Sequence, residues 1–276
     1  MNTAVAGALA RARELGVERL DAQLLVAHVV GQSRAWVVAH DDAALDGGTA
    51  QALTTLLQRR AAGEPLAYLL GEREFHGLML RVTPDVLVPR PDTETLVDWA
   101  LELLANWPTP RVIDLGTGSG AIALAVKRAC PHADVHASDL SDAALVVARA
   151  NGQALGLAVQ WHRGAWWQAA PPGRFHLVLS NPPYVAASDP HLAALRHEPA
   201  MALTPASDRG DGLADIERIV DGATARLHPG AWLLIEHGAD QGDGARTLFE
   251  RTGFCDVQTR PDLAGRPRVT GGRCTQ

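Results

Sequence analysis

The strongest constraint on the fold of this chain is an apolar strand that runs straight into two prolines. Leu177–Ser180 is mostly apolar and reads as a buried strand of a parallel sheet. It is followed by Asn181, Pro182, Pro183 and Tyr184. Neither proline can donate a ladder hydrogen bond, and the residue before a proline is held extended. We therefore predict a stiff turn at the carboxyl end of a strand, where open α/β sheets bind ligands.

The predicted turn carries polar groups that suit a planar nitrogen. It presents the side-chain amide of Asn181, backbone carbonyls without neighbouring amide donors, and the ring of Tyr184. Such groups can accept the hydrogens of an amide-like nitrogen and pack against its plane. Asn-Pro alone is a common turn signal. Asn-Pro-Pro-Tyr directly after an apolar strand is more specific, and it resembles the catalytic tetrapeptide of methyltransferases that alkylate planar nitrogens.

Strands and helices alternate along the second part of the chain. The patterns predict strands at residues 112–115, 134–138, 158–162, 231–236, 254–259 and 268–270, with a further strand that ends at Asn181. They predict helices at residues 121–130, 142–155, 216–227 and 244–251. This alternation is typical of a doubly wound, Rossmann-like α/β sheet that is mainly parallel. We expect its last strand to be antiparallel.

The first part of the chain is helical instead. Val5, Leu9 and Ala12 share one helix face, and a second helix at residues 20–30 has Asp21 as its predicted N-cap. Two more helices are predicted at residues 34–40 and 49–60, and short helices joined by short loops form a small bundle. The expected domains are a substrate-docking bundle at residues 1–70, a hairpin linker at 71–90 and a catalytic domain at 91–276.

Composition argues against several classes of protein. No apolar run reaches the roughly 18 residues of a membrane span, and the first residues lack the basic and apolar regions of a signal peptide. The three cysteines form no close pair, which favours a reducing, cytoplasmic location and argues against a zinc site. A net charge of −6 lacks the basic footprint of a nucleic-acid-binding protein. We therefore expect a cytoplasmic monomer without a metal, a membrane or direct nucleic-acid contact.

A glycine-rich loop after the first strand of the sheet predicts a nucleotide-like cofactor. Gly116, Gly118 and Ala121 match the dinucleotide fingerprint, and Asp139 follows at about the spacing, roughly 20 residues, of a ribose-binding acid. An NAD enzyme satisfies this spacing. However, Asp114 closely precedes the loop, and a pyrophosphate disfavours a nearby carboxylate. S-adenosylmethionine has no phosphate and carries an ammonium group that Asp114 can attract, while glycines allow close backbone approach.

Two tryptophans complete the predicted cofactor site. Trp166 and Trp167 follow the third predicted strand, at the carboxyl edge of the sheet. There we expect Trp166 to stack on the adenine ring and Asp139 to accept both ribose hydroxyls. The cofactor-binding residues predicted in this way are Asp114, Gly116, Thr117, Gly118, Ser119, Gly120, Asp139, Trp166 and Asn181.

Six short motifs occur in the order in which a known family carries them. They are Leu20–Ala22, Gly71–Phe75, Pro89–Glu94, Asp114–Gly120, Asn181–Tyr184 and Glu236–Gly238. On these motifs the chain resembles the HemK/PrmC family of glutamine-N5 methyltransferases over essentially its whole length, the helical N-terminal part included. The chain departs from the family at Ala165, where an acid often precedes the tryptophan. We therefore expect no hydrogen bond from this position to the adenine amino group.

The resemblance implies an enzyme that methylates the glutamine in the Gly-Gly-Gln loop of class 1 peptide chain release factors. The methyl donor is S-adenosyl-L-methionine, the product is S-adenosyl-L-homocysteine, and no metal takes part. The implied catalytic residues are Asn181 and Pro182, whose oxygens accept the two N–H hydrogens of the substrate amide. Pro183 and Tyr184 hold the plane of that amide. No strong general base is implied, because a methylated amide nitrogen loses its proton readily.

Other functions stay open at this point. Adenine-N6 methylation of DNA or RNA uses the same tetrapeptide, because an exocyclic amino group poses the same problem, and it also needs an extruded base. Its discriminators, a basic groove and a target-recognition segment, are not clear in the sequence. A ribosomal protein is another candidate for the methylated protein. A non-catalytic binding module and an NAD dehydrogenase are the remaining alternatives.

Overall fold

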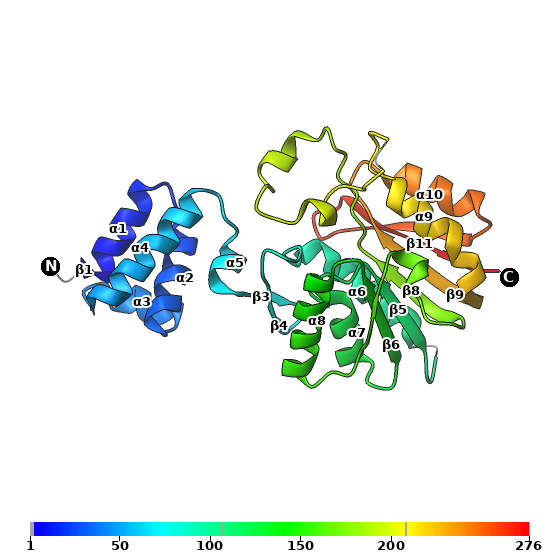
Figure 1. Cartoon of the computed structure of the whole chain (residues 1–276), viewed down its shortest axis with the longest axis horizontal. Helices are drawn as coiled ribbons and strands as arrows, with labels where there is room; N and C mark the ends of the chain where they lie inside the picture. The colour runs from blue at the N-terminus through cyan, green and yellow to red at the C-terminus, as the bar shows by residue number, and fades with distance from the viewer. Residues whose placement is uncertain (1–2, 106, 208, 276) are drawn as a thin grey trace. The chain divides into compact units, whose positions relative to one another are not determined.

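The computed structural model describes residues 3–105, 107–207 and 209–275. By internal packing the chain divides into two units, Met1–Glu72 and Arg73–Gln276. The first unit is coloured blue to cyan in Figure 1, and the second runs from cyan to red. Among the described residues, no helix combines the length and the apolar composition needed to cross a membrane.

The first unit is a bundle of short helices around an aliphatic core. Its helices are α1 (Val5–Glu14), α2 (Arg19–Val30), α3 (Arg34–Ala39), α4 (Gly47–Ala61) and α5 (Leu66–Leu70). Two short strands, β1 (Thr3–Ala4) and β2 (Ala44–Leu45), pair antiparallel. Ser33 caps α3 by accepting from the Trp36 amide, and Asp46 caps α4 by accepting from the Thr49 amide. Leu25, Leu53 and Leu57 are buried in the core between the helices.

The predicted N-cap of the second helix is wrong. The helix begins at Arg19 after Glu18, and Asp21 lies inside its first turn. The Asp21 carboxylate accepts a hydrogen bond from Arg60 Nε at 2.6 Å, and this ion pair joins α2 to α4. Aspartate favours cap positions, but the position of Asp21 is explained by its ion pair with another helix. An acid in the first turn also interacts favourably with the helix dipole.

The second unit is built on a twisted sheet of seven strands. The strands are β5 (Arg111–Leu115), β6 (Asp134–Asp139), β7 (Gln160–Arg163), β8 (Phe175–Ser180), β9 (Leu227–Glu236), β10 (Cys255–Pro261) and β11 (Pro267–Arg273). They are ordered β10-β11-β9-β8-β5-β6-β7. Neighbours from β9 to β7 pair in parallel, and β11 is antiparallel to both of its neighbours. This confirms the predicted fold class, including the antiparallel last strand.

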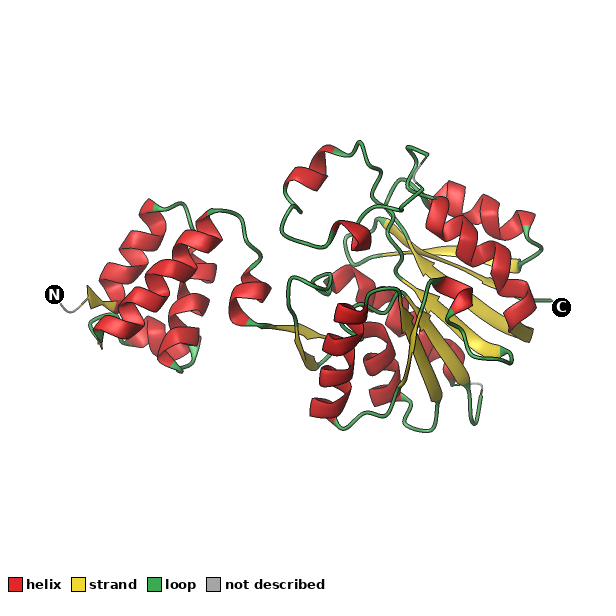
Figure 2. Ribbon diagram, viewed as in Figure 1, coloured by secondary structure: helices red, strands yellow, loops and turns green. Residues whose placement is uncertain are grey.

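Helices cover both faces of the sheet (Figure 2). The α-helices of this unit are α6 (Glu94–Leu104), α7 (Ala121–Ala129), α8 (Asp142–Leu155), α9 (Ala214–Ala223) and α10 (Gly242–Arg251). Short 3₁₀ turns are η1 (Pro91–Thr93), η2 (Trp166–Gln168), η3 (Pro190–Ala193), η4 (Ala200–Ala202) and η5 (Thr224–Arg226). The strand β9 begins four residues before its predicted start. The Pro229-Gly230 pair suggests a strand break in the sequence, but the structure accommodates it within the strand by a register shift against β8.

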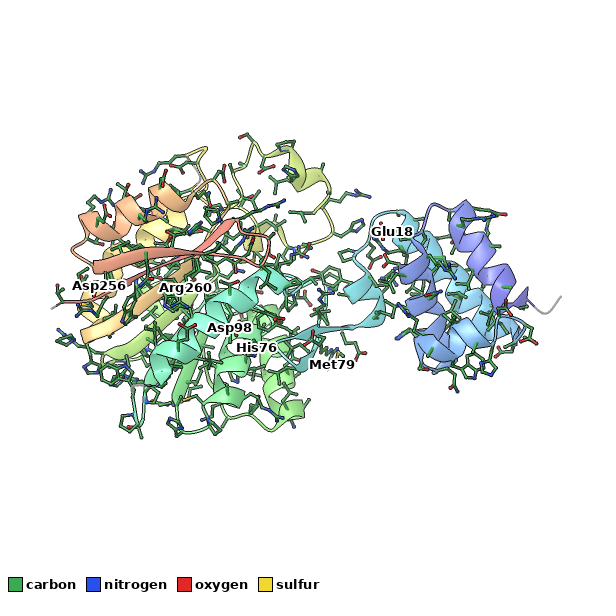
Figure 3. The ribbon with its side chains drawn as sticks, turned by 180° about the vertical axis from the view of Figure 1, so that it is seen from behind. Glu18, His76, Met79, Asp98, Asp256 and Arg260 are labelled. Carbon is green, nitrogen blue, oxygen red and sulfur yellow. The ribbon has the colours of Figure 1, made fainter. Side chains whose placement is uncertain are left out.

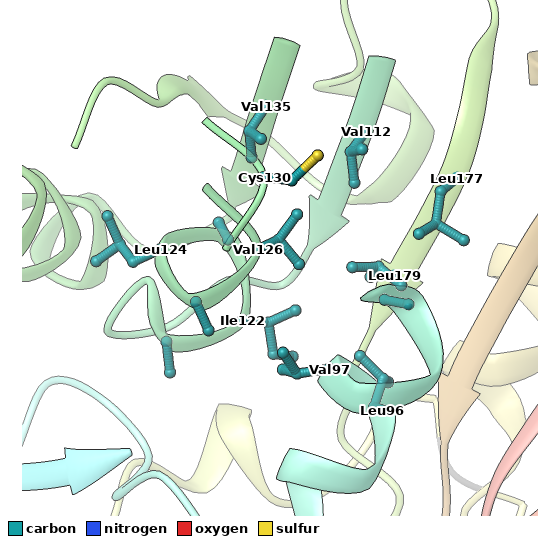
Figure 4. Close-up of a cluster of buried hydrophobic side chains, with 14 of the residues drawn as sticks. Leu96, Val97, Val112, Ile122, Leu124, Val126, Cys130, Val135, Leu177 and Leu179 are labelled. Carbon is teal, nitrogen blue, oxygen red and sulfur yellow. The ribbon is translucent and has the colours of Figure 1, made fainter. Parts of the chain in front are cut away.

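Two apolar cores fill the space between the sheet and its helices. Side chains of a strand alternate between the faces, so Val112 packs against α6 and α7 whereas Ile113 packs with α9 and α10. Figure 4 shows the first core, where Leu96 and Ile122 meet the strands near Leu179. Both faces of the central strands are therefore apolar, which explains why their sequences read as nearly continuous apolar runs.

The hairpin of β3 (Glu72–Phe75) and β4 (Leu78–Arg81) is tied to the second unit by polar contacts. Asn151 of α8 accepts from the Arg81 amide at 2.8 Å and donates to the carbonyls of Arg81 and Ser119. At the hairpin turn, His76 Nε2 lies 3.0 Å from the Asp98 carboxylate of α6 (Figure 3). The hairpin and the glycine loop thus share one anchor, Asn151.

We expect Gly271→Ala to destabilise the second unit by about 1–3 kcal/mol, since overpacking a close-packed core costs this much. A Cβ at Gly271 would lie 2.4 Å from Leu234 Cδ2 and 2.6 Å from the buried ring of Trp99. The matched control is Gly242→Ala, where a Cβ meets its nearest neighbour at 3.4 Å. Urea unfolding of both variants measures the difference, and equal stabilities would contradict this account of the core.

Candidate active site

The predicted site residues converge where the ends of β5, β6 and β8 lie side by side. The amides of Gly116 and Thr117 both donate to the Ser138 carbonyl at 2.9 Å, which fixes the glycine loop to the end of β6. The Ser180 hydroxyl donates to the Leu115 carbonyl at 2.7 Å and joins β8 to β5. The chain leaves β5 towards β6 on one side and returns through β8 on the other, so this edge is the switch point of the sheet.

A cavity of about 850 Å³ opens at this edge. The predicted residues that line it are Gly116, Thr117, Gly118, Ser119, Asp139, Trp166, Asn181 and Pro183. Of the residues that the structure describes, Asp114 and Gly120 are not part of this lining. Gly120 sits at the start of α7 with φ of 86°, and a Cβ there would meet Leu124 and Trp161 at 3.1 Å. Its position therefore serves the turn and its packing.

Asp114 lies beneath the loop and is fully buried. Its Oδ2 accepts a hydrogen bond from the Thr117 hydroxyl at 2.5 Å, and its Oδ1 has no hydrogen-bond partner among the described residues. Burial raises the pKa of Asp114 to about 7, against the opposing effect of the Thr117 hydrogen bond. A buried carboxyl with an unpaired oxygen, one hydroxyl away from the cavity, suits a nearby cationic group.

Asp139 faces the cavity with both carboxylate oxygens already oriented. The Gly118 amide donates to Oδ2 at 2.9 Å and the Ser141 amide donates to Oδ1 at 2.8 Å. Burial nevertheless raises the pKa of this carboxyl. Each oxygen keeps a further lone pair, so the pair can accept two neighbouring hydroxyl groups.

The two neighbouring tryptophans have different structural roles. Trp166 has φ of 46°, a conformation that is strained for a bulky residue, and a Cβ on Gly116 would lie 3.1 Å from its ring. The strained backbone thus places an aromatic ring against the glycine loop on the cavity wall. Trp167 donates from Nε1 to the Ile219 carbonyl at 2.8 Å and packs closely on Gly222. It therefore holds η2 on α9.

The Asn-Pro-Pro-Tyr turn separates the first cavity from a second one of about 230 Å³. Pro182 and Tyr184 line the second cavity, and Asn181 lines both. Asn181 Nδ2 donates to the Thr93 hydroxyl at 3.2 Å. Because its nitrogen is held there, the side-chain oxygen is the atom of Asn181 that can accept from a bound group.

Several residues that support the turn were not predicted as site residues. The Tyr184 hydroxyl donates to Glu236 Oε1 at 3.2 Å, and Gln241 Nε2 donates to the Tyr184 carbonyl at 2.9 Å. Burial raises the pKa of Glu236 to about 7 and also raises the pKa of Tyr184. Thr93 and Glu236 belong to the motifs Pro89–Glu94 and Glu236–Gly238. The sequence therefore marked these residues but did not indicate their role.

Arg90, which forms part of the wall of both cavities, is held in an ion pair. Its partner is the carboxylate of Glu198, whose side chain is 2% exposed. Glu198 Oε2 also accepts from the Val88 amide at 3.1 Å. The sequence places Arg90 between two prolines at a helix start, but it offers no signal for Glu198. Among the described residues, no group of three or more His, Cys, Asp or Glu side chains is arranged to hold a metal ion.

Known proteins resemble this chain in both units. Two family models match it, the PrmC N-terminal domain over residues 4–71 and the methyltransferase small domain over residues 94–201. The release factor glutamine methyltransferase of Bordetella pertussis is 52% identical over 260 residues, covering 93% of this chain and 95% of that protein. The protein of the same name from Burkholderia pseudomallei is 48% identical over 279 residues, covering 98% of this chain and 96% of that protein.

Solved structures add a likeness of fold. A T. thermophilus 16S rRNA methyltransferase, solved in complex with AdoMet and guanosine, has a TM-score of 0.55 and 20% sequence identity. The match covers 74% of this chain and 49% of that one. At this identity the likeness concerns the fold alone.

We expect the free energy of unfolding of Asp114→Asn, relative to that of the wild type, to increase by about 1–3 kcal/mol as the pH rises from about 5 to about 8. The folded pKa of about 7 exceeds the value of 3.8 for an exposed aspartate, so the stabilising contribution of the protonated carboxyl is present at low pH. It is lost as the pH rises through about 7. Urea unfolding at both pH values measures the change. Asp142→Asn, which removes an exposed carboxyl, is the control, and a pH-independent difference for Asp114→Asn would contradict the account.

Proposed function

The chain belongs to the family of release factor glutamine methyltransferases, and from that premise we propose that it methylates the side-chain amide nitrogen (N5) of the glutamine in the Gly-Gly-Gln loop of class 1 peptide chain release factors. The observation that carries the proposal is the position of Asn181, a residue that lines two adjoining cavities. A methyl donor in the larger cavity and a substrate amide in the smaller one would meet at this residue.

The chemical difficulty lies in the substrate nitrogen. Its lone pair is delocalised into the carbonyl, and amide rotation barriers of about 18–20 kcal/mol show the scale of that resonance. The Asn181 oxygen and the Pro182 carbonyl accept the two N–H hydrogens and so fix the orientation of the nitrogen. Pro183 and Tyr184 hold the amide plane. Positioning of this kind can lower the activation free energy by roughly 7–11 kcal/mol.

The larger cavity fits S-adenosylmethionine, which supplies a methyl group activated by a sulfonium. Asp139 would hold the ribose hydroxyls through the free lone pairs of its oriented carboxylate. Trp166 would cover the adenine, and Asp114 would attract the ammonium group from beneath Thr117. The raised pKa of Asp114 supports this assignment, because a cation restores the ionised form that burial disfavours.

The reaction does not require a strong base. The substrate nitrogen gains a methyl group as the carbon–sulfur bond breaks, and the resulting cationic amide loses one proton to water. The residues around the turn therefore need to hold the substrate and need not remove its proton. Tyr184 stays protonated, because its hydroxyl is buried and donates to Glu236, and its pKa is raised.

Two features favour a protein substrate over a nucleobase. The net charge is −6, whereas a nucleic-acid enzyme depends on contacts with phosphates. The helical first unit matches the PrmC N-terminal domain over nearly its whole length. We propose that this unit docks the release factor.

We expect Asn181→Ala to lower kcat at least a hundredfold, as the loss of a positioned hydrogen-bonding group in an active site does. Affinity for S-adenosylmethionine should fall much less, because the glycine loop and Asp139 stay in place. The assay measures transfer of a labelled methyl group to an intact release factor, with the modified residue located by mass spectrometry. Turnover close to that of the wild type would refute the role of Asn181. Transfer to a ribosomal protein, with the release factor unmodified, would refute the substrate.

We expect Asp139→Ala to weaken binding of S-adenosylmethionine by about tenfold or more, since the lost hydrogen bonds to a charged group are worth about 1.5–3 kcal/mol. Asp142→Ala is the matched control, because this aspartate lies three residues further on and pairs with Arg163 on the surface. Isothermal titration calorimetry gives both affinities. A similar loss in the two variants would contradict the assignment of Asp139.

A further inference from the structure

Glu236 is an acid that the fold encloses beside the Asn-Pro-Pro-Tyr turn. It is the last residue of β9, it is 1% exposed, and it lines neither of the two cavities. Its Oε2 has no hydrogen-bond partner among the described residues. An enclosed carboxyl of this kind opposes folding. The contacts of the carboxyl group with the turn therefore need a reason other than stability.

Two hydroxyl groups of the candidate active site donate to this carboxylate. The Tyr184 hydroxyl donates to Oε1 at 3.2 Å, and the Thr93 hydroxyl forms a second hydrogen bond to the carboxyl group. The Thr93 oxygen in turn accepts from Asn181 Nδ2 at 3.2 Å. An ionised carboxylate can only accept, so both hydroxyl hydrogens are directed at Glu236.

The direction of these hydrogen bonds decides which end of the Asn181 amide is free. Because Thr93 gives its hydrogen to Glu236, its oxygen is left to accept, and only the nitrogen of Asn181 can donate to it. The Asn181 oxygen then remains for the N–H hydrogens of a substrate amide. If the Thr93 hydroxyl donated to Asn181 instead, the amide would turn over. Its NH2 group would then face the NH2 group of the substrate, and two donors would meet without an acceptor.

The groups around Glu236 place its ionisation close to neutral pH. Burial raises the pKa of Glu236 to about 7, against the hydrogen bond from Thr93 and the positive charge of Arg268 on β11. Asp92 of η1 lies 3.3 Å from Arg268 and raises the pKa further. Burial lowers the pKa of His237, the next residue, so its ring adds no positive charge at neutral pH. A modest change of pH therefore changes the charge of Glu236.

We propose, on the basis of the proposed function, that Glu236 is a positioning residue for methyl transfer. Its ionised carboxylate directs the hydroxyl hydrogens of Thr93 and Tyr184, and through Thr93 it keeps the oxygen of Asn181 turned towards the substrate amide. Because Glu236 lines neither cavity, its effect falls on the chemical step and leaves cofactor binding unchanged. The orientation of the turn is obtained at the expense of stability.

The test begins with Glu236→Gln, which keeps the shape of the side chain and removes its charge. A glutamine amide can donate as well as accept, so it no longer fixes the direction of the hydrogen bonds. At about pH 8 and saturating S-adenosylmethionine, kcat for an intact release factor should fall about ten- to a hundredfold, as it does when a reacting group is misplaced. The Kd for S-adenosylmethionine should stay within about twofold of the wild-type value. Glu250→Gln, which alters an exposed acid on α10, is the control.

The pH dependence of kcat and the stability distinguish positioning from structural support. The kcat of the wild type should fall as the pH drops below about 7, where Glu236 becomes protonated, and Glu236→Gln should lack this step. The folded pKa exceeds the value of 4.5 for an exposed glutamate, so the stabilising contribution of the protonated acid is lost as the pH rises through about 7. At about pH 8 we therefore expect Glu236→Gln to resist urea at least as well as the wild type.

A second pair of variants tests the same contacts without altering the buried charge. Thr93→Val removes the hydroxyl group, keeps the shape of the side chain, and should lower kcat about as much as Glu236→Gln. Thr93→Ser keeps the hydroxyl group and should restore most of the turnover. Since Glu236 acts through Thr93, the double variant Glu236→Gln/Thr93→Val should be about as slow as the slower single variant, whereas independent effects would multiply.

Four results would overturn the inference. The first is a kcat of Glu236→Gln within about twofold of the wild-type value, and the second is a wild-type kcat that does not fall below about pH 7. The third is a joint loss of stability, cofactor affinity and kcat in Glu236→Gln, which would make Glu236 a structural residue. The fourth is a double variant in which the two effects multiply. In all four the wild type still methylates the release factor. If it does not, the proposed function fails, and the role of Glu236 fails with it.

Discussion

The hydrogen bond from the Asn181 amide to the Thr93 hydroxyl is the contact on which the rest of the site depends. It joins the end of β8 to the start of α6, two segments that lie 88 residues apart in the chain. By occupying the nitrogen of Asn181, it leaves the oxygen to accept from a bound group. The two prolines then fix the backbone of the turn, so the orientation of one amide defines the boundary between the two cavities.

Two buried acids lie near the ends of strands β5 and β9, at the same edge of the sheet. Asp114 and Glu236 are both fully enclosed, and each has one carboxylate oxygen without a hydrogen-bond partner within residues 3–105, 107–207 and 209–275. Their raised pKa values show that the protein alone does not compensate these charges. In the proposed function the ammonium group of the methyl donor would supply the missing compensation at Asp114, which would link the electrostatics of the fold to the choice of methyl donor.

The sequence predicted those parts of the site that follow from the geometry of a parallel sheet. Gly116 and Asn181 follow a strand and Asp139 ends one, and parallel strands end at one edge, so their convergence needed no tertiary information. Thr93, Gln241 and Glu198 were missed because long-range packing brings Thr93 and Gln241 to the turn and Glu198 to Arg90. Asp21 was misread for the same reason, since its partner Arg60 comes from another helix. Residue propensities describe local structure, whereas the contacts of these residues join segments that are distant in the sequence.

Asn181 borders both cavities, and this has a consequence for inhibition. Direct transfer across one side chain requires both reactants to be bound together, which corresponds to a sequential kinetic scheme without a methylated enzyme. A single molecule that joined a nucleoside part to a glutamine-like part would occupy both cavities at once. Each half would hold the other at a high effective concentration, so such a bisubstrate compound would bind far more tightly than either half alone.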